Sequence, residues 1–232
     1  MLLALAAPPA AQAQNNDSSL QKLRVAKFVL PEFPPHVELA ATSQGFVTVA
    51  IGRDAEGYVT DVLVLASTHA ELSRSVVEAV KKWKFTLPGN LAPAGKEIFP
   101  VVRFVFSAKG VVVVSATTGS RAAKAPQVGD DSSLHLPSFA DLDSVPLPLN
   151  HPMPSFTGSA AARAIGGTAT VKYFVDEEGH VRVPLVTECS SPELGLAALA
   201  AVEQWTFEPP RLAGRPTIAL ETGSFSFGLV KD

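Results

Sequence analysis

The fold of this chain is decided by a stretch of 44 residues that occurs twice. It reads GFVTVAIGRDAEGYVTDVLVLASTHAELSRSVVEAVKKWKFTLP from Gly45 to Pro88, and it aligns without a gap with GTATVKYFVDEEGHVRVPLVTECSSPELGLAALAAVEQWTFEPP from Gly167 to Pro210. Sixteen of the 44 aligned pairs are identical. An offset of 122 residues is too long for a solenoid repeat, whose units bury a face on their neighbours. The alignment therefore predicts a tandem duplication of a small domain that has its own core.

A β-hairpin is expected at the start of each copy, because two stretches rich in β-branched residues flank an Asp-x-x-Gly turn. Gly57 and Gly179 can adopt the positive φ that closes such a turn. Asp54 and Asp176 can accept hydrogen bonds from backbone amides across it. We interpret the two aspartates as turn formers, because no second carboxylate or histidine accompanies them at the spacing of metal ligands.

A helix is expected after each hairpin, because apolar residues recur there at the 3.6-residue period. Its apolar positions are Leu72, Val76, Val80 and Trp83 in the first copy, and Leu194, Ala198, Val202 and Trp205 in the second. Thr68 with Glu71 fits a capping box at the first helix, and Ser191 before Pro192 fits an N-cap at the second.

Each copy ends in a strand with a Phe-x-Phe pattern, formed by Phe104 and Phe106 or by Phe225 and Phe227. Burial of one aromatic ring contributes about 2 to 3 kcal/mol, and a domain this small needs such rings in its core. We therefore interpret the Trp and Phe side chains as core residues rather than ligand contacts. The predicted fold class is α+β, with two tandem ββαβ domains, each a three-stranded, mainly antiparallel sheet with one packed helix.

The remaining segments are predicted to be a leader and two linkers. Residues 1–13 resemble a signal peptide, since an apolar run is followed by an Ala-Gln-Ala triplet; a disordered Ala/Pro-rich tail is the alternative. Residues 14–30 are expected to be an N-terminal linker, 31–116 the first domain, 117–150 a second linker and 151–230 the second domain. Val111 to Val114 follow a turn signal and are expected to add a strand that covers the last strand of the first domain.

Composition and motifs argue against several functions. The net charge is −3 and neither copy carries a basic stripe, so nucleic acid is not expected as a partner. The five histidines stand at no metal spacing, and no nucleophile motif or phosphate-binding glycine loop is present. We therefore expect no enzyme activity, no cofactor and no metal. Cys189 is the one cysteine and forms no internal disulfide.

The ordered set of elements resembles the C-terminal domain of the TonB family. The set comprises the Asp-x-x-Gly hairpin, a helix ending A-V-x-x-W-x-F, a following Pro and a terminal F-x-F, and both copies carry it. The family also has an upstream aromatic-Pro element, which Phe33-Pro34 matches and Met153-Pro154 matches loosely. The resemblance covers about two thirds of the chain, in two blocks.

The resemblance implies a periplasmic protein that binds outer-membrane transport receptors in energised uptake of a siderophore or similar nutrient. Binding would occur by β-augmentation, in which an extended peptide adds to the free edge of a sheet. The family's receiving edge is the last strand, and here that strand carries Ile98, Val102, Arg103, Phe104 and Phe106 in the first copy, and Ile218, Leu220, Thr222, Ser224 and Phe225 in the second. Self-association through the same edges is a further option.

Members of the family that transduce energy carry an N-terminal transmembrane helix with a functional His, followed by a long Pro-rich spacer. Here the apolar start contains no His, and no long Pro-rich spacer separates it from the first domain. The alternative is therefore a soluble periplasmic adaptor or scaffold that keeps edge-strand binding without energy transduction.

Overall fold

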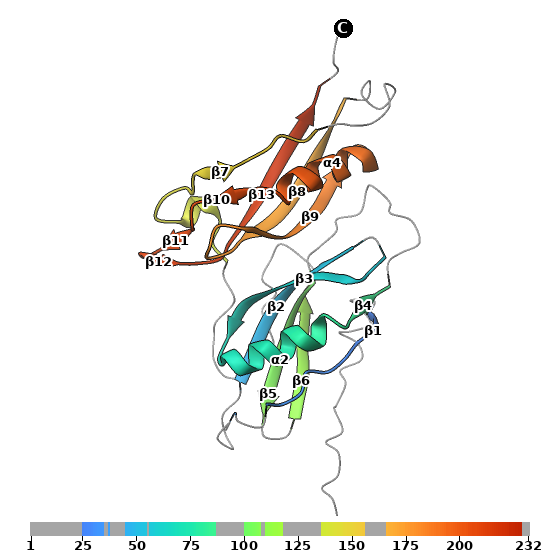
Figure 1. Ribbon diagram of the computed structural model, residues 1–232, viewed down its shortest axis with the longest axis vertical. Helices are drawn as coiled ribbons and strands as arrows, with labels where there is room; N and C mark the ends of the chain where they lie inside the picture. Colours follow the sequence, from blue (N-terminus) through green and yellow to red (C-terminus); the bar gives the residue numbers. More distant parts are fainter. Residues whose placement is uncertain are drawn as a thin grey trace, which may run out of the picture.

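The computed structural model consists of two α+β units stacked along the long axis of the molecule (Figure 1). It describes residues 25–34, 37, 45–54, 56–86, 100–107, 110–117, 136–155 and 166–228. Within these ranges each unit has one α-helix on one face of an antiparallel sheet, and the mixed α+β class is confirmed.

The first unit has a four-stranded sheet in the order β3-β2-β5-β6. Its elements are β1 (Val25–Lys27), β2 (Gly45–Arg53), β3 (Val59–Ser67), α2 (Ala70–Val80), β4 (Lys84–Phe85), β5 (Val101–Ser107) and β6 (Gly110–Thr117). Here β6 pairs with β5 along its whole length, as the Val111–Val114 pattern predicts. The expectation of three strands is therefore wrong for this unit, since the added hairpin strand widens the sheet.

The second unit has a three-stranded sheet in the order β13-β8-β9. Its elements are η1 (Phe139–Asp141), β7 (Pro148–Asn150), β8 (Gly167–Val175), β9 (Val181–Cys189), α4 (Pro192–Val202), β10 (Thr206–Phe207), β11 (Arg211–Leu212), β12 (Arg215–Pro216) and β13 (Ala219–Phe227). Strand, strand, helix and strand thus follow one another in both units. That order is consistent with a duplication, which stays a prediction from the sequence alignment.

Each unit packs its helix against its sheet through the apolar positions that the sequence indicates. Trp83 is 1% exposed and Trp205 is 4% exposed, so both are core residues. Each indole donates a hydrogen bond to an upstream segment: Trp83 Nε1 to the carbonyl of Val29 at 2.8 Å, and Trp205 Nε1 to the carbonyl of Pro152 at 2.9 Å.

Because of these upstream segments, both folded units begin earlier in the chain than the sequence predicts. β1 pairs with β4, and β7 pairs with β10, so residues 25–30 and 148–150 belong to the folded units and not to linkers. Residues 136–143 also pack on the second unit, where Asp143 accepts hydrogen bonds from the amides of Ala213 and Gly214. The two predicted linkers are therefore too long at their C-terminal ends. Pairing with a two-residue strand leaves no apolar periodicity to indicate it.

The helix starts were predicted with mixed success. Ser191 caps α4, where its hydroxyl accepts a hydrogen bond from the amide of Leu194 and Pro192 occupies the first turn. The capping box of Thr68 and Glu71 is wrong, because the N-cap of α2 is His69. The hydroxyl of Thr68 instead accepts a hydrogen bond from the amide of Phe46 at 3.0 Å, which joins the helix start to β2.

Candidate strand-binding edge and the interface between the units

The outer edge of β13 is the candidate site in the second unit. β13 pairs with β8 from Ala219–Val175 to Phe227–Gly167 without a bulge, so its backbone groups alternate regularly between β8 and the outside. The amide of Leu220 donates outward, to the carbonyl of Pro137 at 2.9 Å. Thr222, Ser224 and Ser226 therefore also direct their N–H and C=O groups outward.

The N-terminal half of this edge is covered by the chain itself. Pro137 takes the place of a neighbouring strand at Leu220, and Phe139 anchors the segment with its ring against Phe207, at 5.3 Å between centroids. The carboxylate of Glu221 accepts hydrogen bonds from the amides of Phe139 at 3.1 Å and Thr222 at 2.8 Å. The amides of Leu220 and Thr222 are thus already satisfied.

The C-terminal half of β13 is open within the described part of the chain. Ser224 and Ser226 are exposed, and neither has a hydrogen-bond partner beyond β13's own sheet among the described residues. Phe225 lies between them, is 7% exposed and packs in the core of the unit. Of the predicted site residues, Ser224 therefore has the geometry of a strand-receiving position, whereas Phe225 holds the strand in place. Ile218 and Leu220 pack against an apolar cluster at the junction of the units.

In the first unit the predicted edge is wrong. β5 is an internal strand, with β2 on one side and β6 on the other. Val102, Phe104 and Phe106 are fully buried, and the guanidinium of Arg103 lies over the ring of Phe46 at 4.0 Å. Ile98 lies outside the described residues. The edge of this sheet is β6, whose sequence carries four consecutive valines.

The upstream aromatic-Pro element is part of the packing of the first unit. The ring of Phe33 meets that of Phe106 at 6.1 Å between centroids, and the carbonyl of Pro34 accepts a hydrogen bond from Val37 at 3.1 Å. Met153 is 71% exposed, so it does not repeat this contact. The paired indole bonds to Val29 and Pro152 indicate an offset of 123 residues here, which aligns Phe33 with Phe156, outside the described residues.

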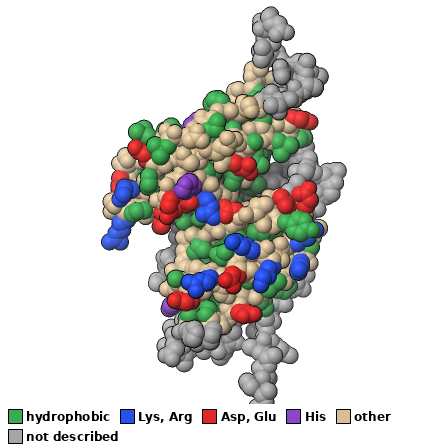
Figure 2. Space-filling model, in the orientation of Figure 1, with side chains coloured by type: hydrophobic (Ala, Val, Ile, Leu, Met, Phe, Trp, Pro, Cys, Tyr) green, Lys and Arg blue, Asp and Glu red, His purple; other side chains and the backbone are tan. Residues whose placement is uncertain are grey.

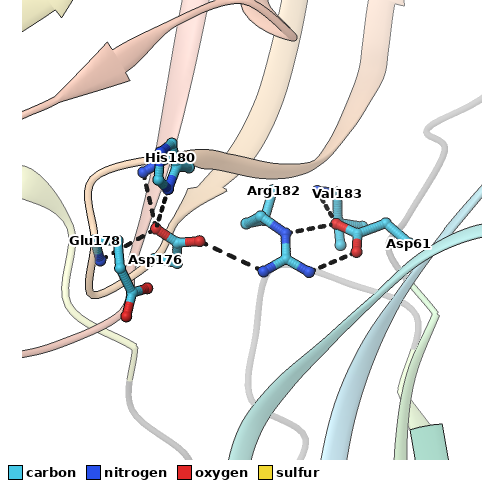
Figure 3. Close-up of polar contacts among 6 residues, drawn as sticks. All are labelled: Asp61, Asp176, Glu178, His180, Arg182 and Val183. Carbon is cyan, nitrogen blue, oxygen red and sulfur yellow. Dashed lines mark hydrogen bonds and ion pairs between the residues drawn. The ribbon is translucent and has the colours of Figure 1, made fainter.

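A polar contact joins the two units (Figure 3). Arg182 of β9 binds the carboxylate of Asp61 of β3 through two hydrogen bonds, Nη2 to Oδ1 at 2.6 Å and Nε to Oδ2 at 2.9 Å. Arg182 Nη1 also lies 3.4 Å from Oδ2 of Asp176. The hydrogen bonds to Asp61 raise the pKa of Arg182 above its ordinary value. Acidic and basic side chains accordingly gather at the junction of the units (Figure 2).

Asp176 contributes both to the hairpin turn of the second unit and to the contact between the units. Its Oδ1 accepts the amides of Glu178 at 3.2 Å and His180 at 2.8 Å, which confirms its role as a turn former. Asp54 does the same in the first unit, accepting the amides of Glu56 and Tyr58. Asp176 additionally reaches Arg182, so the hairpin turn of the second unit orients the side chain that binds Asp61 (Figure 3).

An apolar cluster surrounds this contact. Ala50 and Leu63 of the first unit pack with Phe174 and Val183 of the second, and all four are at most 5% exposed. These side chains lie on the sheet faces that point away from the helices. The alignment pairs Leu63 with Leu185, which also contacts the cluster, so equivalent hairpins of the two units face each other.

This interface was not predicted from the sequence. Asp61 and Arg182 stand in strands as ordinary polar residues, and nothing in one sequence pairs them. One signal was available: Pro184 interrupts a predicted strand, and proline in a strand indicates an edge or a bulge.

The buried phenol of Tyr173 leads to a prediction about pH. Burial, and secondarily the charge of Glu221, raises the pKa of Tyr173 well above its ordinary value. The unfolded chain then loses this proton near pH 10 while the folded chain retains it, so the stabilising effect is complete below pH 10 and is lost as pH rises further. We expect the free energy of unfolding to fall above pH 10 by up to about 1.4 kcal/mol per pH unit on this account. Urea unfolding of Tyr173→Phe between pH 8 and 11 should show a shallower decline than wild type; equal slopes would contradict the assignment.

The described residues contain no group of three or more His, Cys, Asp or Glu side chains able to hold a metal ion. Among them, likewise, no helix is long and apolar enough to cross a membrane.

The described residues of the second unit thus define an antiparallel sheet with one packed α-helix and a last strand whose outer edge is partly open among those residues. Residues 152–229 match the model of the family described as Gram-negative bacterial TonB protein C-terminal. The match begins after η1 and β7 and includes every element of the second unit from β8 to β13.

One similar solved structure is the C-terminal domain of TonB from Pseudomonas aeruginosa, determined by NMR in solution. It is 28% identical, the alignment covers 39% of this chain and 92% of that one, and the TM-score is 0.34. No curated protein matches this chain.

Proposed function

We propose that this chain is a periplasmic protein that binds outer-membrane transport receptors by adding a receptor segment as a strand to β13, in energised uptake of a siderophore or similar nutrient. The observation that carries the proposal is the outer edge at Ser224 and Ser226, which no described residue pairs with and which lies within the segment that matches the TonB C-terminal family. Unpaired backbone groups on an edge strand recruit an extended peptide through main-chain hydrogen bonds.

The geometry defines where the added strand lies. Pro137 and Glu221 occupy the edge at Leu220 and Thr222, so the added strand pairs with the segment from Gly223 to Phe227. Main-chain hydrogen bonds of β13 hold the added strand in place. Side chains on the partner then determine specificity, because alternate residues of the added strand face opposite sides of the sheet.

The experiment is a pull-down with this chain from detergent-solubilised outer membranes of its host, with identification of the captured proteins and competition by a peptide from a captured receptor. Recovery of β-barrel receptors that the peptide displaces supports the proposal. Recovery of soluble periplasmic proteins instead would favour an adaptor without energy transduction.

Replacement of Ser224 by proline should weaken receptor binding. Proline removes the outward N–H, and its ring obstructs an added strand, while the bonds from β13 to β8 are made by the neighbouring residues. We expect at least about tenfold weaker binding, the worth of one or two hydrogen bonds. Calorimetric titration with the receptor peptide measures the change.

Ser224→Ala is the matched control, because it removes the hydroxyl and keeps the amide, and it should bind as wild type does. Circular dichroism must show that both variants are folded. A folded Ser224→Pro variant with unchanged affinity would rule out strand addition at this position.

A further inference from the structure

We propose that the first unit is an internal partner of the second: through Asp61 it closes the outer edge of β9, so that β13 is the edge of the second sheet left to receive another strand. The closure of β9 stands on contacts within this chain. The consequence for β13 rests on the proposed function.

β9 is an edge strand of the second sheet, and its outer side can pair with another strand. In the order β13-β8-β9 its outer side has no neighbouring strand among the described residues. Its partners on β8 include Lys172, which pairs with Leu185, and Phe174, which pairs with Arg182. The register shifts between these two pairs, and Val183 and Pro184 form the bulge. An unprotected edge of nine residues is a template for another chain.

At the bulge, the backbone groups of Val183 and Pro184 depart from the regular hydrogen-bond pattern with β8. Val183 has φ of +48°, a left-handed conformation that is unfavourable for a β-branched residue, and Pro184 has no N–H to donate. Such a conformation persists where the surroundings hold it. Here Val183 is 2% exposed, within the cluster of Ala50, Leu63 and Phe174.

Asp61 supplies the hydrogen bond that an added strand would otherwise make. Its Oδ2 accepts the amide of Val183 at 3.3 Å, and the two bonds from Arg182 fix the carboxylate in that orientation. Figure 3 shows the carboxylate held between the guanidinium and the backbone of β9. The first unit thus caps the one amide of the bulge that points outward.

The contact is made in one direction only, from Asp61 of the first unit to the second, although the sequences of the two hairpins align. Asp61 aligns with Val183, and Arg182 aligns with Thr60, so the reciprocal bond from the second unit to the first is absent from the sequence itself. The bulge also differs: in the first unit the shift near the hairpin turn falls between Gly52 and Arg53, opposite Asp61 and Val59. Asp61 thus stands on one hairpin and the bulge that it contacts on the other, and the two have complementary roles.

Amide hydrogen exchange of the full chain, resolved by NMR, tests the closure. We expect the Val183 amide to exchange at least tenfold faster in Asp61→Leu, which has no acceptor, and to change less in Asp61→Asn, which keeps a carbonyl oxygen. Asp143→Ala is the matched control, because Asp143 also accepts backbone amides, at Ala213 and Gly214. That variant should speed exchange at those two amides and leave Val183 unchanged.

Self-association tests whether the closure keeps other chains from β9, since an opened β9 edge is expected to pair with a second copy of the chain. In sedimentation velocity we expect Asp61→Leu to associate at concentrations at least tenfold lower than wild type. Val186 lies in β9 beyond the bulge, opposite Val171 of β8, and Val186→Pro in the same background should reverse the association by obstructing this edge. Equal exchange at Val183 in wild type and Asp61→Leu, or unchanged association, would overturn the proposal. Neither measurement uses a receptor, so failure of receptor binding would leave this result intact.

Discussion

Phe104→Ala should lower the free energy of unfolding of the first unit by about 3 to 5 kcal/mol. The ring is fully buried at the centre of β5, and its centroid lies 5.9 Å from that of Trp83. Because β2 and β6 flank β5 on both sides, the surrounding backbone cannot collapse into the cavity. Chemical denaturation followed by tryptophan fluorescence measures the loss.

Phe225→Ala is the corresponding change in the second unit. Phe225 is 7% exposed and contacts Trp205 at 5.6 Å between centroids, but among the described strands β13 has a neighbour on one side only. We expect a loss toward the lower end of the same range, about 3 kcal/mol. A larger loss for Phe225→Ala than for Phe104→Ala would show that the edge strand is as constrained as the internal one.

The core of both units could be predicted because its signals are local. Leu72, Val76 and Val80 recur at helical spacing, and Trp83 closes the stripe; all four are buried. The hairpin turns were equally accessible, since Asp and Gly at fixed spacing specify the bonds that Asp54 and Asp176 make. These features depend on residues that are near one another in the sequence.

The edges and the junction could not be predicted in the same way, because they depend on contacts between distant segments. β5 carries the Phe-x-Phe pattern of a last strand, yet β6 covers it, so Val102 is an internal residue and a poor site for proline. Pro137 reaches Leu220 from the segment taken as a linker. Asp61 and Arg182 are 121 positions apart and carry no shared pattern.

Gly179→Ala should destabilise the second unit by about 2 to 5 kcal/mol, from two separate causes. Gly179 has φ of +90°, and a left-handed conformation costs an alanine about 1 to 2 kcal/mol. A Cβ there would also collide with the carbonyl oxygen of Phe207, which belongs to the backbone and cannot rotate away. Such overpacking adds about 1 to 3 kcal/mol. The amide of Phe207 donates to the carbonyl of Gly179 at 2.8 Å, so relief by movement would break that bond.

Gly214→Ala separates the two causes. Gly214 has φ of +73°, but nothing lies within 4 Å of the Cβ that alanine would add. This variant should therefore lose only the conformational share, about 1 to 2 kcal/mol. The difference between the two variants, measured by urea unfolding, is the cost of the collision with Phe207. Equal losses would mean that β10 moves aside freely, so that its contact with the hairpin turn at Gly179 and His180 does not constrain the turn.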